Sequence, residues 1–200
     1  MPKTFSESER AYIKNKLKEV AKLCLAQYGV KKTTVDELVK RANIPKGTFY
    51  LFYESKELLF FDVLLEFHDE IHEKLLVEAA AIQDDITPGK LTDLIMGLYK
   101  MVDESFVLKF VSLNEMELLI RKLPPETARN HAMDDNFSVE QLFMAAPKLK
   151  AKNIKAYSAA LRGIFMTMLY KHEIGEDVFE DALRILINGV VMQMFEEEDT

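Results

Sequence analysis

A single cysteine, Cys24, occurs among the 200 residues of this chain, so no disulfide can form within it. Cys24 lies on an apolar helical face, which predicts a buried structural thiol rather than a nucleophile. No stretch approaches the ~18 uncharged apolar residues of a membrane span, and the first residues lack the apolar core of a signal peptide. We therefore expect a cytoplasmic protein with no membrane partner.

Strand-like alternation and internal repeats are also missing, and only the acidic end, Glu196 to Asp199, is low in complexity. Apolar residues recur instead at helical spacing. With 48% hydrophobic residues, the chain can bury a substantial core. No Ser-His-Asp order, phosphate-binding loop or carboxylate pair stands out. We expect an all-α protein with no catalytic residues, no cofactor and no enzymatic activity.

The charge of the chain is unevenly distributed. Its total of −7 by itself disfavours a nucleic-acid partner. Residues 1–60 contain 12 Lys and Arg against 7 Asp and Glu, a net charge of +5, which leaves −12 on the other 140 residues. A basic segment joined to an acidic body is typical of a binding module on a larger domain, and phosphate contact depends on the local charge.

The stretch from Thr33 to Lys56 carries the strongest local signals. The Thr34 hydroxyl can accept a hydrogen bond from a first-turn N–H while Glu37 reaches back to the Thr34 amide, so a helix is predicted to begin there. Pro45 interrupts this helix, but its fixed φ suits the start of a second one. Two short helices joined by a tight turn are therefore predicted.

The second of these helices has two different faces, because each residue advances it by 100°. The packing face holds Phe49, Phe52 and Tyr53, and the outward face holds Gly47, Tyr50 and Leu51, with Thr48 at the edge. A helix of about two turns needs such packing to persist. Its outward N-terminal end fits the major groove of double-stranded DNA, where Lys, Thr and Tyr side chains can contact phosphates.

These residues resemble the helix-turn-helix of the TetR family of bacterial transcriptional repressors. The resemblance covers about Ile13 to Leu65 and rests on Gly29, Thr33-Thr34-Val35, Gly47-Thr48-Phe49-Tyr50, Tyr53 and Ser55-Lys56-Glu57-Leu58-Leu59, in that order and spacing. The sequence departs from the family at Pro45 and at Leu51-Phe52-Tyr53, where more polar residues are common. The resemblance implies a three-helix DNA-binding domain at residues 1–54 and a larger helical domain for effector binding and dimerisation at residues 55–200.

The outward face and the resemblance together predict eight DNA contacts: Thr33, Thr34, Lys46, Gly47, Thr48, Tyr50, Leu51 and Lys56. Lys56 stands in the first turn of a helix from Ser55 to about Ala81, where its charge opposes the helix dipole. A DNA phosphate docked there would relieve the conflict. The preceding helix, Ala11 to Tyr28, is expected to stop at a left-handed Gly29. Its lysines either face solvent or contact phosphate: Lys14, Lys16, Lys18 and Lys22.

Past a loop at Asp84–Lys90, helices are expected at 91–103, 105–122, 138–146, 153–171 and 176–195. In the resembling family the last two helices pair with their copies in a second subunit, which implies a homodimer. The predicted interface residues are Ala156, Ala160, Gly163, Phe179, Leu183, Ile187, Val190, Val191 and Met194. An intrachain core would explain the same apolar stripe. A dimer would place two recognition helices about 34 Å apart, matching a palindromic operator.

The resemblance further implies a small-molecule effector that releases the repressor from DNA. Aromatic and methionine side chains suit an apolar or aromatic ligand, although they are also typical of a plain core. The candidate lining residues are Phe106, Phe110, Met116, Phe137, Phe143, Met144, Tyr157, Phe165 and Met168. Following the family, effector binding is expected to tilt the connecting helix and separate the two recognition helices.

His68 and His72 form a pair four residues apart on that connecting helix, a spacing that can ligate zinc. A zinc-protease helix needs Glu directly after the first His, where Asp69 stands, and no third ligand follows. Solvated histidines and no metal site are therefore expected. The alternative to a DNA-binding regulator is a helical protein that binds a metal or a protein partner through this region without enzymatic activity.

Overall fold

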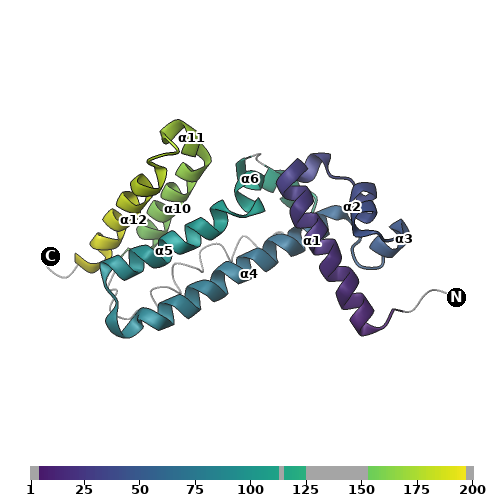
Figure 1. The fold of residues 1–200 in the computed structure, drawn as a ribbon, viewed down its shortest axis with the longest axis horizontal. Helices are drawn as coiled ribbons and strands as arrows, with labels where there is room; N and C mark the ends of the chain where they lie inside the picture. The colour runs from purple at the N-terminus through teal and green to yellow at the C-terminus, as the bar shows by residue number, and fades with distance from the viewer. Residues whose placement is uncertain (1–4, 113–114, 125–152, 197–200) are drawn as a thin grey trace. The chain divides into compact units, whose positions relative to one another are not determined.

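The computed structural model describes residues 5–112, 115–124 and 153–196, and every regular element among them is a helix (Figure 1). The chain forms two compact units, one made of residues 1–68 and 105–128 and the other of residues 69–104 and 129–200. This division differs from the expected boundary after residue 54. The reason is that residues beyond that point, up to His68, and again from Ser105, pack with the N-terminal helices.

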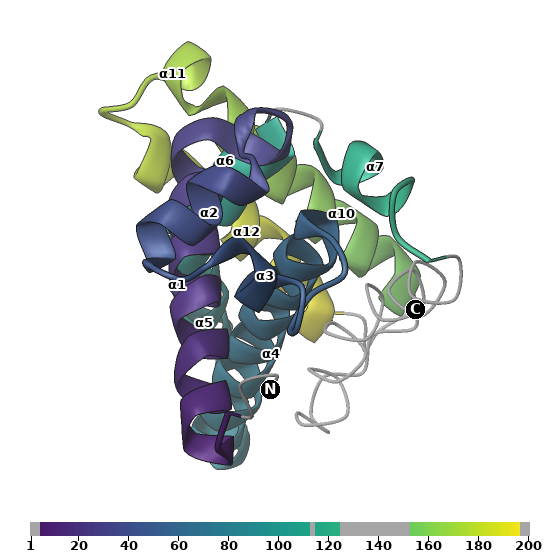
Figure 2. The ribbon, with the colours of Figure 1, turned by 90° about the vertical axis from the view of Figure 1, so that its right-hand side faces the viewer.

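The N-terminal unit contains α1 (Glu7–Lys32), α2 (Val35–Ala42), α3 (Lys46–Phe49), the start of α4 (Lys56–Ile82), α6 (Phe106–Ser112) and α7 (Glu115–Ile120). Helix α1 packs against α2, α6 and α7, and α2 packs against α3 (Figure 2). Large apolar side chains from all six helices meet in one core: Leu17, Leu25, Leu38, Phe49, Phe60, Phe110 and Leu119.

Helix α1 is closed by local signals at both ends. The Ser6 Oγ accepts a hydrogen bond from the Glu9 N–H at 3.3 Å, and the Glu9 carboxylate accepts from the Ser6 N–H at 2.9 Å. This capping box starts the helix earlier than the predicted Ala11. At the other end the helix breaks at Gly29, as predicted, although its φ of 75° and ψ of −176° are not those of a left-handed helical residue. One more turn then leads to Lys32.

The C-terminal unit contains the rest of α4, η1 (Gln83–Asp85), α5 (Pro88–Asp103), α10 (Ile154–Thr167), η2 (Met168–Tyr170), α11 (Lys171–Ile174) and α12 (Phe179–Glu196). Helix α12 packs against both α5 and α10 (Figure 1). The Tyr99 hydroxyl donates to the Leu161 carbonyl at 2.7 Å, which ties α5 to α10. None of the helices in the described ranges is both long and apolar enough to cross a membrane.

The predicted elements of this part of the chain need two adjustments. The loop expected at Asp84–Lys90 is shorter, because Thr87 caps α5 and Pro88 occupies its first turn. The helix expected at 105–122 corresponds to α6 and α7, which flank residues 113–114. The helix expected at 138–146 lies outside the described residues.

Candidate nucleic-acid interface

Helix α2 and its turn into α3 are delimited by three residues with distinct backbone preferences. Thr34 caps α2 and accepts a hydrogen bond from the Glu37 N–H at 3.2 Å. The Glu37 carboxylate does not complete the expected reciprocal cap but accepts from Arg41 Nε at 2.6 Å. Asn43 ends α2 in the left-handed conformation (φ 52°), and Pro45 with extended ψ starts α3. The sequence thereby sets the direction in which α3 leaves α2.

Helix α3 is shorter than the predicted two turns, because it ends at Phe49, but the two faces of α3 and of the turn that follows it lie as predicted. Phe49 is fully buried and Tyr53 nearly so, whereas Tyr50 and Leu51 expose 51% and 57% of their surface. The rings of Phe49 and Tyr50 meet edge to face with centroids 5.3 Å apart, so the buried ring supports the exposed one. A short helix is therefore held from behind while its outer edge remains accessible.

Gly47 lies on this outer edge, and its lack of a side chain is not required by the protein's own packing. A Cβ placed on Gly47 would meet no atom within 4 Å, and its φ is not in the positive range. The position therefore leaves room for the backbone of α3 to approach another molecule closely.

Lys46 and Thr48 complete the edge. Lys46 Nζ lies 2.9 Å from Asp36 Oδ1 on α2, and this hydrogen-bonded pair raises the pKa of Lys46. Both side chains of the pair are largely exposed, so the ammonium can exchange Asp36 for another anion at little cost. Thr48 is half-buried at the border between the two faces.

Two residues predicted to contact DNA form hydrogen bonds within the protein. Thr33 is fully buried, and its Oγ1 donates to the Gly29 carbonyl at 2.7 Å. Lys56 Nζ donates to the carbonyls of Val30 and Thr33 at 2.7 and 2.5 Å. Backbone carbonyls at the end of α1 thus compensate the charge of Lys56 in the first turn of α4. Burial lowers the pKa of Lys56.

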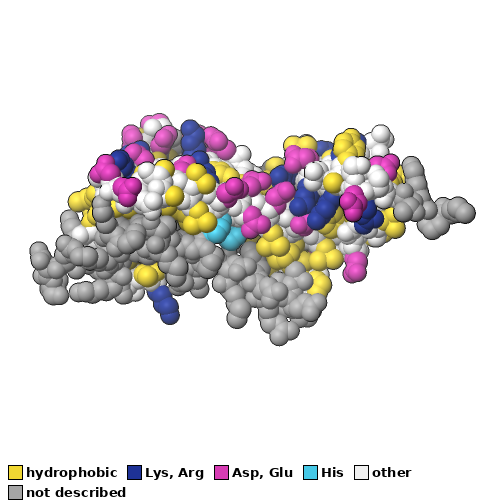
Figure 3. Space-filling view, turned by 90° about the horizontal axis from the view of Figure 1, so that it is seen from below, with side chains coloured by type: hydrophobic (Ala, Val, Ile, Leu, Met, Phe, Trp, Pro, Cys, Tyr) yellow, Lys and Arg dark blue, Asp and Glu magenta, His cyan; other side chains and the backbone are white. Residues whose placement is uncertain are grey.

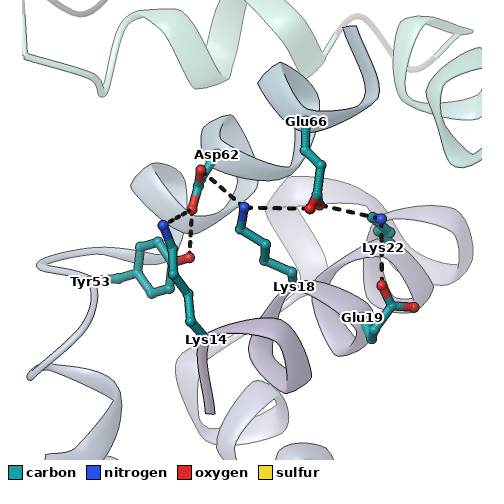
Figure 4. A network of polar contacts seen from close by, with 7 residues as sticks. All are labelled: Lys14, Lys18, Glu19, Lys22, Tyr53, Asp62 and Glu66. Carbon is teal, nitrogen blue, oxygen red and sulfur yellow. Dashed lines mark hydrogen bonds and ion pairs between the residues drawn. The ribbon is translucent and has the colours of Figure 1, made fainter. Parts of the chain in front are cut away.

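The lysines of α1 form a ladder of ion pairs with α4 (Figure 4). Lys14 and Lys18 lie 3.1 and 3.3 Å from the Asp62 carboxylate, and Lys22 lies 3.3 Å from Glu66. Tyr53 donates its hydroxyl hydrogen to Asp62 at 2.7 Å, so the ladder also holds the segment after α3. Sequence reasoning missed these acidic partners. Their spacing of four residues on α4, matching that of the lysines on α1, was a usable signal.

The pKa of Asp62 records the balance of these contacts. Burial by itself raises the pKa of this carboxyl group, but hydrogen bonds from Tyr53 and Lys14 and the charge of Lys18 outweigh it. The pKa of Asp62 therefore lies below its ordinary value.

Figure 3 shows that lysine and arginine side chains of this unit lie among acidic and apolar ones on the visible face. A continuous basic surface is not seen among the described residues on that face.

A cavity of about 240 Å³ opens in the C-terminal unit between α5, η2, α11 and α12. Its apolar wall is formed by Met96, Tyr99, Met168, Phe179 and Leu183, and its rim by charged side chains that include Lys100, Asp103, Lys171 and Glu180. Lys171 Nζ lies 2.9 Å from Asp103 Oδ2, a hydrogen bond that raises the pKa of Lys171. The cavity therefore combines an apolar wall with paired charges at its mouth.

Of the predicted pocket residues that the structure describes, only Met168 lines this cavity. Phe106 and Phe110 belong to the core of the N-terminal unit, and Met116 lines a separate depression on that unit. Tyr157 is buried in the C-terminal unit, and the ring of Phe165 packs edge to face on Tyr99 with centroids 6.0 Å apart. Phe137, Phe143 and Met144 lie outside the described residues.

The predicted dimer stripe divides into two groups. Five of its side chains are already buried within one chain: Phe179, Leu183, Ile187, Val191 and Met194. Val190 is half-buried, and Ala156, Ala160 and Gly163 are exposed. The α12 side chains of the first group form the packing surface toward α5 and α10, which is the intrachain explanation of the stripe. They need no second subunit to be buried.

His68 and His72 lie half-buried on α4. Within residues 5–112, 115–124 and 153–196, no group of three or more His, Cys, Asp or Glu side chains is arranged to hold a metal ion. This part of the structure provides no support for the metal-binding alternative.

Residues 18–63 match the family model of bacterial regulatory proteins of the tetR family. The matched segment begins within α1 and ends in α4, so it contains the whole helix-turn-helix. Over this segment the chain is similar to the TetR family. The uncharacterized HTH-type regulators YhgD and YdgC of Bacillus subtilis are 39% identical over 56 residues and 30% identical over 73 residues. The matches span 29% and 37% of those relatives and 28% and 35% of this chain.

Solved structures extend the likeness in fold to nearly the whole chain. A chain assigned to the TetR-family regulators of Mesorhizobium loti MAFF303099 superposes with a TM-score of 0.72 at 16% identity, covering 95% of this chain and 97% of that one. FadR of Thermus thermophilus, a TetR-family repressor in complex with lauroyl-CoA, superposes with a TM-score of 0.56 at 16% identity, covering 94% and 95%.

Proposed function

We propose that this chain is a DNA-binding transcriptional regulator of the TetR family that acts as a homodimeric repressor at a palindromic operator. The outer edge of α3 carries the proposal. It presents Gly47, Tyr50 and Leu51 outward from a helix that is fixed from behind by Phe49 and Tyr53. A short, supported helix of this kind reads the major groove with its N-terminal residues while neighbouring polar groups contact phosphates.

An exposed apolar face on α10 and α12 supports the homodimer. It includes Met166, Ile185, Leu186 and Met192, with Ile185 exposing 71% of its surface. Atoms added as Cβ to Gly163 and Gly189 would meet nothing within 4 Å, so a second pair of helices can approach closely. We assign the dimer contacts to this face, together with Ala156, Ala160 and Gly163. Two-fold pairing would give the recognition helices the symmetry of a palindromic operator.

The cavity in the C-terminal unit supports a small effector with an apolar part. Its wall of methionine, leucine and aromatic side chains can bury such a group, and a structural relative was solved with lauroyl-CoA. Effector binding would release the repressor only if the ligand prefers the conformation that does not fit DNA.

A mobility-shift titration tests DNA binding. The probe is the duplex upstream of the protein's own reading frame, titrated at about 50 and 200 mM salt beside an unrelated duplex of equal length. We expect specific binding that weakens at least about tenfold over this range, because Lys and Arg contacts release counterions. A module for a protein partner would show no salt-sensitive affinity, and equal binding to both duplexes contradicts operator recognition. Adding acyl-CoA thioesters and aromatic acids to the bound complex then tests release.

A further inference from the structure

The junction between α1 and α2 is held by a side chain that is distant in sequence. Helix α1 breaks at Gly29, and the next two N–H groups donate to one carboxylate, that of Glu115 at the start of α7. Val30 N lies 2.5 Å from Oε2 and Lys31 N lies 3.2 Å from Oε1. Glu115 is only 3% exposed. A carboxylate this deeply buried is tolerable because both its oxygens accept hydrogen bonds.

Lys56 engages the same short segment through its carbonyl groups. Its ammonium donates to the Val30 and Thr33 carbonyls, while the Thr33 hydroxyl donates to the Gly29 carbonyl. The N–H groups of Val30 and Lys31 therefore bind a buried carboxylate, and the carbonyl groups of Val30 and Thr33 bind a half-buried ammonium group. We call these contacts of Glu115 and Lys56 the junction clamp.

Gly29 allows this close approach. A Cβ at this position would lie 2.8 Å from Glu115 Cδ, closer than carbon atoms come in ordinary packing, and the φ of 75° is itself unfavourable for other residues. The absence of a side chain at Gly29 thus has two consequences: the backbone can adopt a positive φ, and the Glu115 carboxylate can approach closely.

We propose that Glu115 is a positioning residue for DNA recognition. It fixes the segment that ends at Thr33, directly before Thr34 caps α2, and so determines the direction in which α2 and α3 are presented. The proposal rests on the proposed DNA-binding function. It adds that a residue of α7, whose carboxylate binds the end of α1, controls how well the outer edge of α3 matches its operator.

Full-length variants Glu115→Ala and Glu115→Gln test this role, with Glu117→Gln as a matched control. Glu117 is an exposed carboxylate of the same helix that pairs with Arg121. The first probe is a duplex selected from a random pool by the wild-type protein, and the second is an unselected duplex of equal length. Hydrogen exchange at the Val30 and Lys31 amides is measured on the same samples.

For Glu115→Ala we expect about tenfold weaker binding of the selected duplex, less than about twofold change for the unselected one, and faster exchange at both amides. Glu115→Gln should lose less, because its single carbonyl oxygen still accepts one bond, and Glu117→Gln should match the wild type. If Glu115→Ala fails to fold, Glu115→Gln carries the same comparison.

Two results would overturn the proposal. One is an equal loss for both duplexes that matches the unfolded fraction, which indicates loss of fold alone. The other is unchanged exchange at Val30 and Lys31. If the wild-type protein selects no duplex at all, the proposed function fails instead, and the amide exchange still reports whether Glu115 holds the junction.

Discussion

The two units differ in what they leave exposed. The N-terminal unit gathers its apolar side chains in one core and presents a narrow edge at α3, where an aromatic ring stands beside an open glycine. In the C-terminal unit, α12 has apolar residues on two faces, one buried against its own chain and one exposed. A narrow edge that includes Lys46, Thr48 and the Tyr50 hydroxyl suits a groove lined by phosphates, whereas a broad apolar face suits another protein surface. Substitutions that affect one property and not the other test this contrast.

The largest effect is expected for Gly29→Ala. The new Cβ would collide with the Glu115 carboxylate at a φ of 75°, so we expect the N-terminal unit to lose about 2–3 kcal/mol of unfolding free energy. Thermal and urea unfolding measure the loss, and the dimer should persist. Gly97→Ala is the control, since a Cβ there has only an ordinary contact at 3.9 Å. Equal stability of the two variants would contradict the junction clamp.

Ile185→Glu should weaken the dimer without unfolding the chain. Two-fold symmetry places the new charge in the interface twice, so we expect the dissociation constant to rise at least about tenfold in analytical ultracentrifugation. The matched control is Leu23→Glu on α1, where a similarly exposed leucine lies in the other unit. If both variants sediment as the wild type does, the exposed face of α12 is not the interface.

Tyr50→Ala should reduce operator affinity by about tenfold while leaving the melting temperature nearly unchanged, because the ring is half exposed. Tyr12→Ala, which removes an even more exposed ring from α1, serves as control. Fluorescence anisotropy with a labelled operator measures both. Unchanged operator affinity of the Tyr50→Ala variant would show that the Tyr50 ring does not contact the operator.

Gly47→Ala sharpens the contrast within one helix. The added methyl group meets open space, so stability should be unchanged or gain up to about 1 kcal/mol from helix propensity. Operator affinity should nevertheless fall several-fold if the backbone of α3 approaches DNA closely. A variant with unchanged affinity would show that Gly47 is not at the contact.

The smallest effect is expected for Asp62→Asn and concerns the dependence of stability on pH. The folded pKa of Asp62 is depressed, so its ion pairs stabilise the N-terminal unit above the unfolded pKa, and this stability is lost as pH falls through the folded pKa. Asp62→Asn should cost on the order of 1 kcal/mol at pH 7 and flatten the loss of stability below about pH 4. Urea unfolding at several pH values measures this, with exposed Asp181→Asn as control. An unchanged pH dependence would show that the ladder adds no net stability.

Local signals in the sequence predicted the parts of the fold that depend on neighbours in the chain. The Thr34 cap, the break at Gly29 and the two faces around α3 follow from residues within one or two turns. The capping box of Ser6 and Glu9 had the same kind of signal and was readable from the sequence as well.

Contacts between distant segments could not be predicted in this way. Lys56 was expected to meet a phosphate, because the Val30 and Thr33 carbonyls that bind it are 26 and 23 residues away. Glu115 lies 85 residues from Val30 and has no sequence pattern that links it to α1. For α12, the periodicity of the sequence revealed apolar stripes but not which stripe packs against the same chain. Apolar residues buried within one subunit and apolar residues buried between two subunits recur at the same helical spacing.

The discontinuity of the N-terminal unit limits how the protein can be made and divided. Phe106, Phe110 and Leu119 complete its core, and Glu115 closes its junction, so a fragment ending at residue 54 lacks these groups and should not fold stably. During synthesis, the ribosome must make more than half of the chain before the N-terminal unit has all the helices of its core and can fold. The unit proposed to bind an operator can therefore fold completely only after α5, a helix of the other unit, has been synthesised.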